Sequence, residues 1–320
     1  MDVLRMAPKL CLGALSTFSV AAQIIKEFDV RVISAYHIFS AGLVGSWVSK
    51  RFGIPLVTTV FGEIFAFPSL YRHLRTVAVK ILQSSHRIIS CSQHCADSLR
   101  NLNVDLPVEV VYYGVDPARF HPGVDGAPMR ARWGLSPERQ VVLYLARMVH
   151  EMGLHVLLKA IPEVLRSQPS SFFVIAGASG SLSPEAVRVA NRYPQNVVVL
   201  PDIPTEDLPG LYAAADVLAA PSINQRACFG LSIAEASAVG RPAVGCQIGG
   251  TPEVLQHGKN GLLVPPADPQ ALAQALLTLL ENPSLCQEMG REGRKCVTEK
   301  FDVLNTHRSM ERIFLETLPV

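Results

Sequence analysis

Short apolar runs alternate with longer segments of helical periodicity along nearly the whole chain. The short runs are rich in Val and Ile and predict buried strands, whereas apolar residues that recur every three to four positions predict helices. Alternation of the two kinds of segment is typical of βαβ units and parallel sheets. The predicted strands cover residues 30–35, 55–60, 87–91 and 108–112, then residues 141–145, 172–176, 197–200, 217–220, 243–246 and 261–264.

Helical patterns fill the intervals between these strands, and a loop rich in Pro and Gly at residues 114–126 interrupts them once. Such a composition is typical of a linker, so we expect two doubly wound α/β domains. In folds of this kind ligands bind beyond the carboxyl ends of the strands. The predicted helices cover residues 40–51, 71–83 and 92–101, then 154–167, 184–192, 208–215, 231–239 and 269–280, and a charged helical tail covers residues 283–318.

The apolar segment at residues 10–25 has two interpretations. Arg5 and Lys9 precede it, as positive residues precede a secretory signal. Several Ser, Thr, Gly and Gln residues interrupt it, however, and it is shorter than a comfortable membrane span. We therefore expect a helix of the first domain. A complete Rossmann half would begin with a strand and a Gly-rich turn, and neither precedes Leu10, so both are expected to be missing.

Composition narrows the choice of partners. A net charge of +2 over 320 residues gives no general attraction to nucleic acid or to anionic membranes. The seven cysteines lack the spacing of a zinc site, and we interpret Cys91 and Cys95 as buried small side chains in a reducing compartment. We expect a cytoplasmic protein without a metal site, a cofactor or a nucleic-acid partner. A peripheral contact with the inner face of a membrane is compatible with this composition, and the oligomeric state stays open.

The segment at residues 220–261 carries most of the candidate chemistry. A predicted strand ends at Ala220, and Phe229-Gly230 then lead into a helix that begins at Leu231. Backbone N–H groups at such a helix start form a natural seat for a diphosphate. One turn further, Glu235 interrupts an apolar face, where it could bind the hydroxyls of a ribose or pair with a basic side chain.

The same segment resembles the donor-binding domain of the family 4 retaining glycosyltransferases. Arg147, after the strand at residues 141–145, resembles the diphosphate-binding arginine of that family, and residues 114–122 resemble its interdomain signature. The resemblance covers residues from about Val30 to the tail. The matching positions in the segment are Pro221, Ser222, Phe229, Gly230, Leu231, Glu235, Ala236, Gly240, Pro242, Gly249, Gly250, Glu253, Gly258, Asn260 and Gly261.

The resemblance implies a GT-B fold, in which two Rossmann-like doubly wound parallel-sheet domains face a cleft. Residues 1–122 would form the acceptor-side domain, residues 123–300 the nucleotide-sugar donor domain, and residues 301–320 a helix that crosses back. The implied reaction transfers a sugar, with retention and without a metal or cofactor, from a nucleotide diphosphate-sugar to a glycan, lipid or small-molecule acceptor.

The resemblance also assigns residues to the donor site but none firmly to catalysis. His37 and Glu63 each follow a predicted strand of the first domain and are candidates for catalysis, although a buried structural role is the simpler interpretation. The donor-binding residues that the resemblance and the Gly-rich turns imply are Arg147, Phe229, Gly230, Leu231, Glu235, Gly249, Gly250 and Thr251.

Four positions depart from the family pattern. Ala227 replaces a Glu and Met152 a Lys, whereas Tyr113 replaces an Asn and Phe61 a His. Lys259 and Arg226 are candidates to replace the lost cation. Two interpretations remain: a divergent enzyme with a rebuilt site, or a nucleotide-sugar-binding homologue or partner subunit with impaired catalysis. Sugar-nucleotide epimerisation is a third hypothesis, with less support from the motif at residues 229–253.

Overall fold

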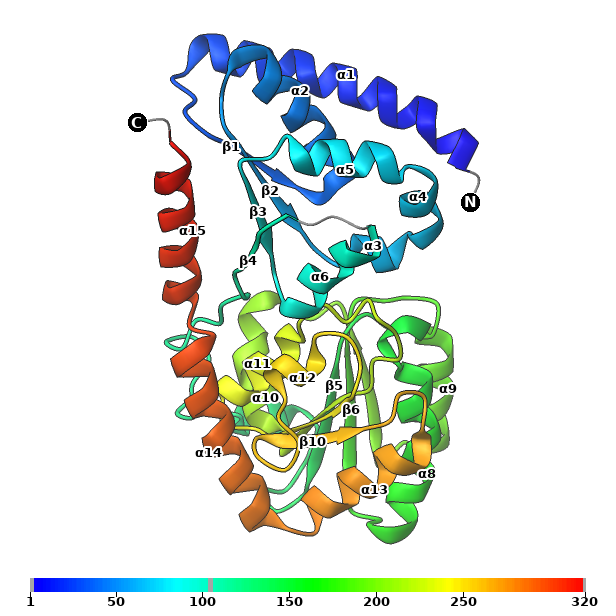
Figure 1. The fold of residues 1–320 in the computed structure, drawn as a ribbon. Coiled ribbons are helices and arrows are strands. Elements are labelled where there is room, and N and C mark those ends of the chain that lie inside the picture. The colour runs from blue at the N-terminus through cyan, green and yellow to red at the C-terminus, as the bar shows by residue number, and fades with distance from the viewer. Residues whose placement is uncertain (1–2, 103–105, 319–320) are drawn as a thin grey trace. The chain divides into compact units, whose positions relative to one another are not determined.

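The computed structural model describes residues 3–102 and 106–318, and the chain forms two compact units. Unit 1 contains Met1–Tyr112 and Thr306–Val320, and unit 2 contains Tyr113–Asn305 (Figure 1). Each unit is built around its own parallel sheet. The prediction of two parallel α/β domains is therefore confirmed.

Unit 1 is built on a four-stranded parallel sheet in the order β1-β2-β3-β4. All five residues of β2 are buried, because helices cover both faces of this inner strand. The strands are β1 (Ile33–Tyr36), β2 (Leu56–Val60), β3 (Arg87–Ser90) and β4 (Val108–Val110). The helical segments between them are η1 (His37–Gly42), α2 (Leu43–Phe52), α3 (Glu63–Ala66), α4 (Pro68–His73), α5 (Arg75–Gln83), α6 (Gln93–Asp97) and η2 (Ser98–Leu102).

The first segment of the chain is a helix of unit 1, as predicted. Helix α1 (Val3–Glu27) packs against α2, and Ala14 shares a small core with Val44 and Val48. Figure 1 shows the two helices side by side. Among the described residues, no helix has the length and apolar character that crossing a membrane requires.

The last helix of the chain belongs largely to unit 1. Helix α15 (Val303–Thr317, red in Figure 1) buries Ile313 against Val57 and Ile89 of the sheet. The hydroxyl of Thr306 donates to the carbonyl of Tyr112 at 2.9 Å, which ties the start of this return to the end of the sheet. The predicted crossing of the C-terminal helix back to the first domain is therefore confirmed.

Unit 2 contains a six-stranded parallel sheet in the order β10-β9-β8-β5-β6-β7. The chain runs outward from β5 to β7 and then returns to the other side of β5, so a topological switch point lies between β5 and β8. The strands are β5 (Val141–Leu145), β6 (Phe172–Gly177), β7 (Val197–Pro201), β8 (Val217–Ala220), β9 (Ala243–Cys246) and β10 (Gly261–Val264).

Helices cover both faces of the unit 2 sheet. On one face, alternate strand residues such as Val142 and Tyr144 pack with α8, α9 and α13. On the other face, α11 contacts β8 and β9 and packs beside α14. The helical segments are α7 (Ala127–Arg132), η3 (His150–Met152), α8 (Leu154–Ser167), α9 (Ser183–Arg192), η4 (Thr205–Asp207), α10 (Leu208–Ala214), α11 (Leu231–Ala238), α12 (Thr251–Val254), α13 (Pro269–Leu280) and α14 (Pro283–Lys300).

The loop at residues 113–122, which the sequence placed in the first domain, packs within unit 2. Val115 donates its N–H to the carbonyl of Phe301 at 2.8 Å and accepts the N–H of Val303 at 3.0 Å. The Arg294 guanidinium donates to the carbonyl of Phe120 at 2.7 Å. These backbone contacts place the start of unit 2 about ten residues before the expected boundary, at Tyr113.

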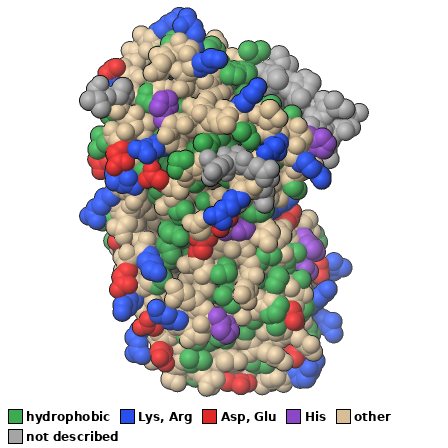
Figure 2. Space-filling view, in the orientation of Figure 1, with side chains coloured by type: hydrophobic (Ala, Val, Ile, Leu, Met, Phe, Trp, Pro, Cys, Tyr) green, Lys and Arg blue, Asp and Glu red, His purple; other side chains and the backbone are tan. Residues whose placement is uncertain are grey.

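Charged side chains of both signs are mixed on the face shown in Figure 2, where Lys and Arg lie among Asp and Glu. This distribution agrees with the small net charge of +2. That the protein has no nucleic-acid partner stays a prediction.

Candidate functional site

A cavity of about 840 Å³ lies in unit 2, where β5, β6, β7 and β8 end. Arg147 follows β5, Ala178 follows β6, Asp202 follows β7 and Ser222 follows β8, and all four line it. The cavity thus lies at the topological switch point, where doubly wound sheets bind their ligands. Its volume is in the range of small-molecule sites.

The amino end of helix α11 forms one wall of this cavity. Gly230 precedes the helix with φ of 99°, a backbone conformation that favours glycine, and no side chain caps the helix start. Residues 230–233 line the cavity. Because the first N–H groups of a helix have no carbonyl partner within it, the positive end of α11 can bind an anion there.

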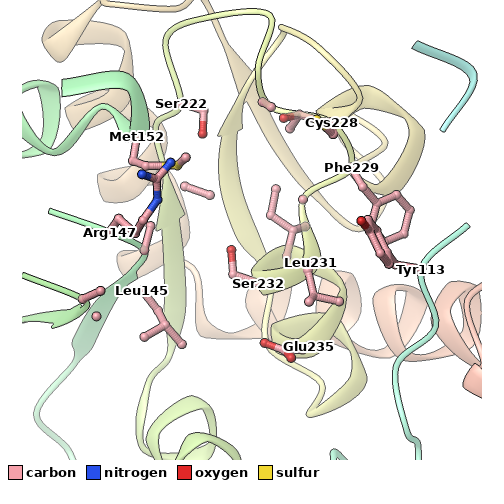
Figure 3. Close-up of a pocket in the computed structure, with 18 of the residues that line it drawn as sticks. Tyr113, Leu145, Arg147, Met152, Ser222, Cys228, Phe229, Leu231, Ser232 and Glu235 are labelled. Carbon is pink, nitrogen blue, oxygen red and sulfur yellow. The ribbon is translucent and has the colours of Figure 1, made fainter. Parts of the chain in front are cut away.

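Arg147 lies on the opposite wall. Figure 3 shows its side chain beside Met152, across the cavity from Leu231 and Ser232. The residue is exposed, and its guanidinium makes no hydrogen bond or ion pair with any described residue. The buried Tyr144 hydroxyl donates to the Arg147 carbonyl at 2.9 Å and fixes the backbone at this point. Arg147 therefore lines the cavity with its guanidinium available to an anionic ligand, and its role as the diphosphate-binding cation stays a prediction.

Glu235 lies on α11, below the helix start, and is half-buried (Figure 3). The Tyr212 hydroxyl donates to its Oε2 atom at 2.7 Å, and no hydrogen bond to Oε1 is present within the described ranges. Burial raises the pKa of the Glu235 carboxyl, although the Tyr212 hydrogen bond and the charge of Arg119 oppose that shift. The carboxylate has a neutral partner on one oxygen, and the other oxygen can accept hydroxyls from a ligand.

Tyr212 is a residue of the cavity lining that the sequence analysis missed. It lies on α10 and is 1% exposed, and burial together with the Glu235 charge raises the pKa of its hydroxyl well above the ordinary value. The available signal was a tyrosine on a buried helix face, because a buried hydroxyl requires a hydrogen-bond partner. The sequence could not identify that partner, because α10 and α11 meet only in the folded unit.

The second Gly-rich turn supports the cavity from behind. Thr251 lines the cavity, but Gly249 and Gly250 do not. A side chain on Gly249 would place its Cβ atom 2.2 Å from the carbonyl oxygen of Ala227, and one on Gly250 would place it 1.9 Å from that of Cys228. The Gly250 N–H also donates to the Ala227 carbonyl at 2.6 Å. These two glycines therefore hold the loop before α11, and that they also contact a ligand stays a prediction.

Apolar and aromatic side chains complete the lining. Leu145, Ile203 and Leu208 lie on the side of β5 and β7, and Phe229 lies before α11. The ring of Phe229 is 2% exposed, and its centroid is 6.0 Å from that of Tyr113. A flat ring system such as a nucleobase would find apolar surface on this lining, and anionic groups would find positive charge at α11 and Arg147.

Three of the four positions that depart from the family pattern also lie at this cavity, among them Tyr113, whereas Phe61 lies in unit 1. Met152 and Ala227 both line the cavity. Arg226 lines it too, but its guanidinium pairs with Glu151 at 3.4 Å. Lys259 is exposed and lies outside the lining. Of the two candidate replacement cations, only Arg226 is therefore close enough to act.

His37 and Glu63, the candidates for catalysis, lie in unit 1 and not in this cavity. The His37 Nδ1 atom is 3.5 Å from Oε2 of Glu63, so the fold brings the two residues together. Within the described ranges, no group of three or more His, Cys, Asp or Glu side chains could hold a metal ion. The absence of a metal from the reaction stays a prediction.

Comparisons with known proteins place this geometry in context. Residues 127–296, more than half of the chain, match the family described as glycosyl transferases group 1. Residues 2–119 match the family described as Glycosyltransferase Family 4. The first match contains all residues of the cavity lining except Tyr113.

Two relatives illustrate the range of similar proteins. A D-inositol 3-phosphate glycosyltransferase of Segniliparus rotundus is 34% identical over 272 residues, which cover 80% of this chain and 60% of the relative. A GDP-mannose-dependent α-(1-6)-phosphatidylinositol monomannoside mannosyltransferase of Mycolicibacterium smegmatis is 38% identical over 189 residues, which cover 57% of this chain and 49% of the relative. The chain thus spans about half to three-fifths of the length of these two relatives.

Solved structures share the architecture. HepE of Anabaena in complex with UDP superposes with a TM-score of 0.81 at 22% identity and covers 93% of this chain and 82% of its own. Sucrose-phosphate synthase of Thermosynechococcus elongatus gives a TM-score of 0.79 at 22% identity and covers 94% of this chain and 77% of its own. At this level of identity the likeness concerns the fold.

Proposed function

Because the chain belongs to the glycosyl transferases group 1 family, we propose that it transfers a sugar from a nucleotide diphosphate-sugar to a hydroxyl acceptor. Its two parallel-sheet domains have the GT-B fold, as predicted. The observation that carries the proposal is the cavity of unit 2, which collects Arg147, the amino end of α11 and Glu235 around one space.

Each group has a physical role in this proposal. The diphosphate binds between the Arg147 guanidinium and the N–H groups at the start of α11, which both favour negative charge. The charge on the diphosphate increases as the glycosidic bond to it breaks, so these fixed positive groups stabilise the transition state. Glu235 accepts hydrogen bonds from the ribose hydroxyls, and the apolar lining receives the base.

The finer points rest on the resemblance to family 4. We propose retention of configuration at the anomeric carbon and a reaction without a metal, since Arg147 and α11 supply positive charge at the diphosphate. A cytoplasmic location, with peripheral contact to a membrane where the acceptor is a lipid, is part of the same proposal. The acceptor belongs to unit 1 in this scheme and is a glycan, a lipid or a small molecule.

The relatives narrow the choice of substrates to test. One is named for D-inositol 3-phosphate, and the other for GDP-mannose and a phosphatidylinositol monomannoside. The HepE structure contains UDP. We therefore propose UDP- and GDP-sugars as donors and an inositol-containing small molecule or lipid as the first acceptors to examine.

A thermal-shift and calorimetric screen tests the donor part. UDP-, GDP- and ADP-sugars are titrated against the protein, and a ligand at 100 times its Kd should add about 2.7 kcal/mol of stability. Transfer to D-inositol 3-phosphate and hydrolysis of the donor in water are then measured with the donor that binds. Absence of binding by every nucleotide sugar would contradict the proposal, and interconversion of donor sugars without an acceptor would instead indicate an epimerase.

A non-catalytic nucleotide-sugar-binding protein is the second candidate, because Met152 and Ala227 line the cavity where the family pattern has charged residues. The double change Met152→Lys with Ala227→Glu should then raise donor affinity or hydrolysis about tenfold to a hundredfold, through charge-assisted contacts of about 1.5–3 kcal/mol. Each single change serves as a control. A wild-type protein that hydrolyses its donor quickly, with a slower double variant, would instead support a rebuilt active site.

A further inference from the structure

The carboxyl end of strand β1 in unit 1 has an unusual backbone at His37. This residue has φ of 72°, a conformation that non-glycine residues rarely adopt, and it begins the π-helical segment η1. Strained residues and π-helical turns occur preferentially at functional sites. The geometry therefore marks His37 independently of its position in the sequence.

Glu63 lies beneath His37 and is 7% exposed. Its Oε1 atom accepts the N–H of Ile38 at 3.2 Å, and its Oε2 atom accepts the N–H of Phe61 at 2.6 Å. Burial raises the pKa of this carboxyl, while its own backbone N–H, the charge of His37 and the two N–H groups oppose that shift. Because both oxygens have partners inside the protein, Glu63 is suited to orient a neighbour and not to bind a substrate.

The neighbour that Glu63 orients is the imidazole of His37. Nδ1 of His37 is 3.5 Å from Oε2 of Glu63, and the His37 side chain is 50% exposed. A carboxylate on this side favours the tautomer in which Nδ1 carries the hydrogen, because the partner of one ring nitrogen determines the state of the other. Nε2 then has a free lone pair, and it makes no hydrogen bond with any residue that the structure describes.

Aromatic rings flank this imidazole. The Phe61 centroid lies 4.9 Å from that of His37 and 6.0 Å from that of Tyr36, with the Tyr36 and Phe61 rings 14° from parallel. Tyr36 is 49% exposed. A hydrogen-bond acceptor beside a half-exposed aromatic pair suits a ligand that presents both hydroxyls and an apolar ring face.

We propose that His37, held by Glu63, binds a hydroxyl of a polyhydroxylated ring acceptor, a cyclitol or a sugar, whose apolar face lies on Tyr36 and Phe61. Nε2 of His37 accepts the hydrogen bond and fixes the direction of the hydroxyl oxygen. Glu63 is a positioning residue that acts through His37. This assignment rests on the proposed transferase function and adds the residues of unit 1 that receive its acceptor.

Imidazole NMR on the full chain tests this assignment, and the probes are myo-inositol, methyl α-D-mannopyranoside and methyl α-D-glucopyranoside. Glycerol is the open-chain control. The protein has nine histidines, so the His37 signals are identified by their loss in His37→Asn, since Asn tolerates a positive φ. We expect the Nδ1–H tautomer in the free protein and a saturable shift of the His37 signals with at least one ring polyol but not with glycerol.

Glu63→Gln separates positioning from simple structural support. This variant should lose the preference for the Nδ1–H tautomer and bind the ring polyol at least about fivefold more weakly while it remains folded. Tyr36→Leu should weaken the binding of ring polyols without changing the tautomer of His37. The assignment is wrong if no ring polyol moves the His37 signals, if glycerol moves them equally, or if Glu63→Gln leaves tautomer and binding unchanged.

UDP, GDP and ADP titrations on the same samples keep this test distinct from the test of function. His37 and Glu63 lie in unit 1, so their variants should bind the nucleotide as the wild type does. Nucleotide binding without any response of His37 overturns only the acceptor assignment. Failure of the wild type to bind UDP, GDP and ADP alike overturns the proposed function, whatever the polyols do.

Discussion

Two glutamates in this molecule, one buried and one half-buried, follow similar sequence patterns but have different hydrogen-bond partners in the fold. Glu235 of unit 2 and Glu63 of unit 1 each lie beyond the carboxyl ends of parallel strands, and burial raises the pKa of both. Glu63 has both oxygens occupied by backbone N–H groups. Glu235 has one oxygen occupied, by Tyr212, and the residue lines a cavity.

The difference shows how to tell a ligand-binding carboxylate from a supporting one. A buried carboxylate with all its hydrogen bonds inside the protein orients its neighbours, as Glu63 orients His37. A carboxylate with an open oxygen at a cavity gains a partner only when a ligand binds. Arg147 follows the same rule as Glu235, because its guanidinium has no partner among the described residues.

Removal of Arg147 should have the largest effect. Arg147→Ala should weaken the binding of UDP or GDP by about 1.5–3 kcal/mol, roughly tenfold to a hundredfold in Kd, because a charge-assisted contact to the diphosphate is lost. Uridine or guanosine, which lack the diphosphate, should bind equally to both proteins in calorimetry. Arg188→Ala, on the exposed face of α9 outside the cavity, is the matched control. Equal nucleotide affinities for wild type and Arg147→Ala would remove Arg147 from the site.

Matched Glu→Gln changes test the comparison itself. Glu235→Gln should weaken the binding of ribonucleotides roughly tenfold, since the ribose hydroxyls lose a charged acceptor. The free energy of unfolding should stay nearly unchanged. Glu63→Gln should leave nucleotide binding unchanged and destabilise unit 1 by about 1–3 kcal/mol, because one amide cannot accept two backbone N–H groups on two atoms. Urea unfolding and calorimetry measure both quantities.

The reverse pattern would contradict the comparison. If Glu235→Gln unfolded earlier and still bound nucleotides normally, Glu235 would be the supporting group. If Glu63→Gln weakened the binding of nucleotides, the assignment of separate roles to the two units would be wrong. A 2′-deoxynucleotide adds a control. It should bind more weakly than the ribonucleotide to the wild type, and about as tightly as the ribonucleotide to Glu235→Gln.

The pH dependence of nucleotide binding should follow the raised pKa of Glu235. A raised folded-state pKa means that the stability contributed by this group is present at low pH and is lost as pH rises through that pKa. Nucleotide affinity has the opposite dependence, because ribose hydroxyls donate to the charged carboxylate. We expect affinity to fall on acidification at a pH above the ordinary glutamate value of about 4.3, with a flat profile in Glu235→Gln.

Tyr212→Phe sharpens this measurement. The Tyr212 hydroxyl lowers the pKa of Glu235, so its removal should move the acid limb to higher pH and weaken binding only a few-fold at pH 7.5. An acid limb at the same pH in wild type, Tyr212→Phe and Glu235→Gln would assign the titration to another group.

Much of the fold could be predicted from the sequence because local patterns and tertiary packing agree. The predicted spans of β5, β9 and α8 match those of the structure, where buried strands and an amphipathic helix leave a clear periodicity. The helix predicted at residues 71–83 is divided into α4 and α5 at Leu74. The π-helical start at His37 was missed, because it depends on Glu63, a residue 26 positions away, accepting the N–H of Ile38.

The candidate site was predictable where the backbone itself carries the signal. Gly230 and the helix start at Leu231 were found because glycine and an apolar period define them locally. The distinction between Thr251, which lines the cavity, and Gly249, which supports the loop at Ala227, could not be found in this way. This distinction depends on the close approach of the Gly249 backbone to the Ala227 carbonyl, and the sequence alone does not contain the distance between these two segments.

The smallest expected effect concerns Arg226, the cation that already has a partner. The Glu151–Arg226 pair is 3.4 Å apart, with side chains 40% and 43% exposed, and such pairs contribute only about 0.2–1 kcal/mol. Glu151→Gln removes a negative charge from Arg226, which lines the cavity, so UDP should bind about two- to fivefold more tightly at low salt. The gain should shrink at 0.5 M salt, because screening acts strongly on exposed charges.

An Arg226→Ala background is the control. If Arg226 substitutes for the family's lysine, whose position is Met152 in this chain, the gain from Glu151→Gln should vanish in that background. A gain that persists there would come from the field of Glu151 alone, and weaker binding by Glu151→Gln would show that the pair instead holds the loop before α11 in place.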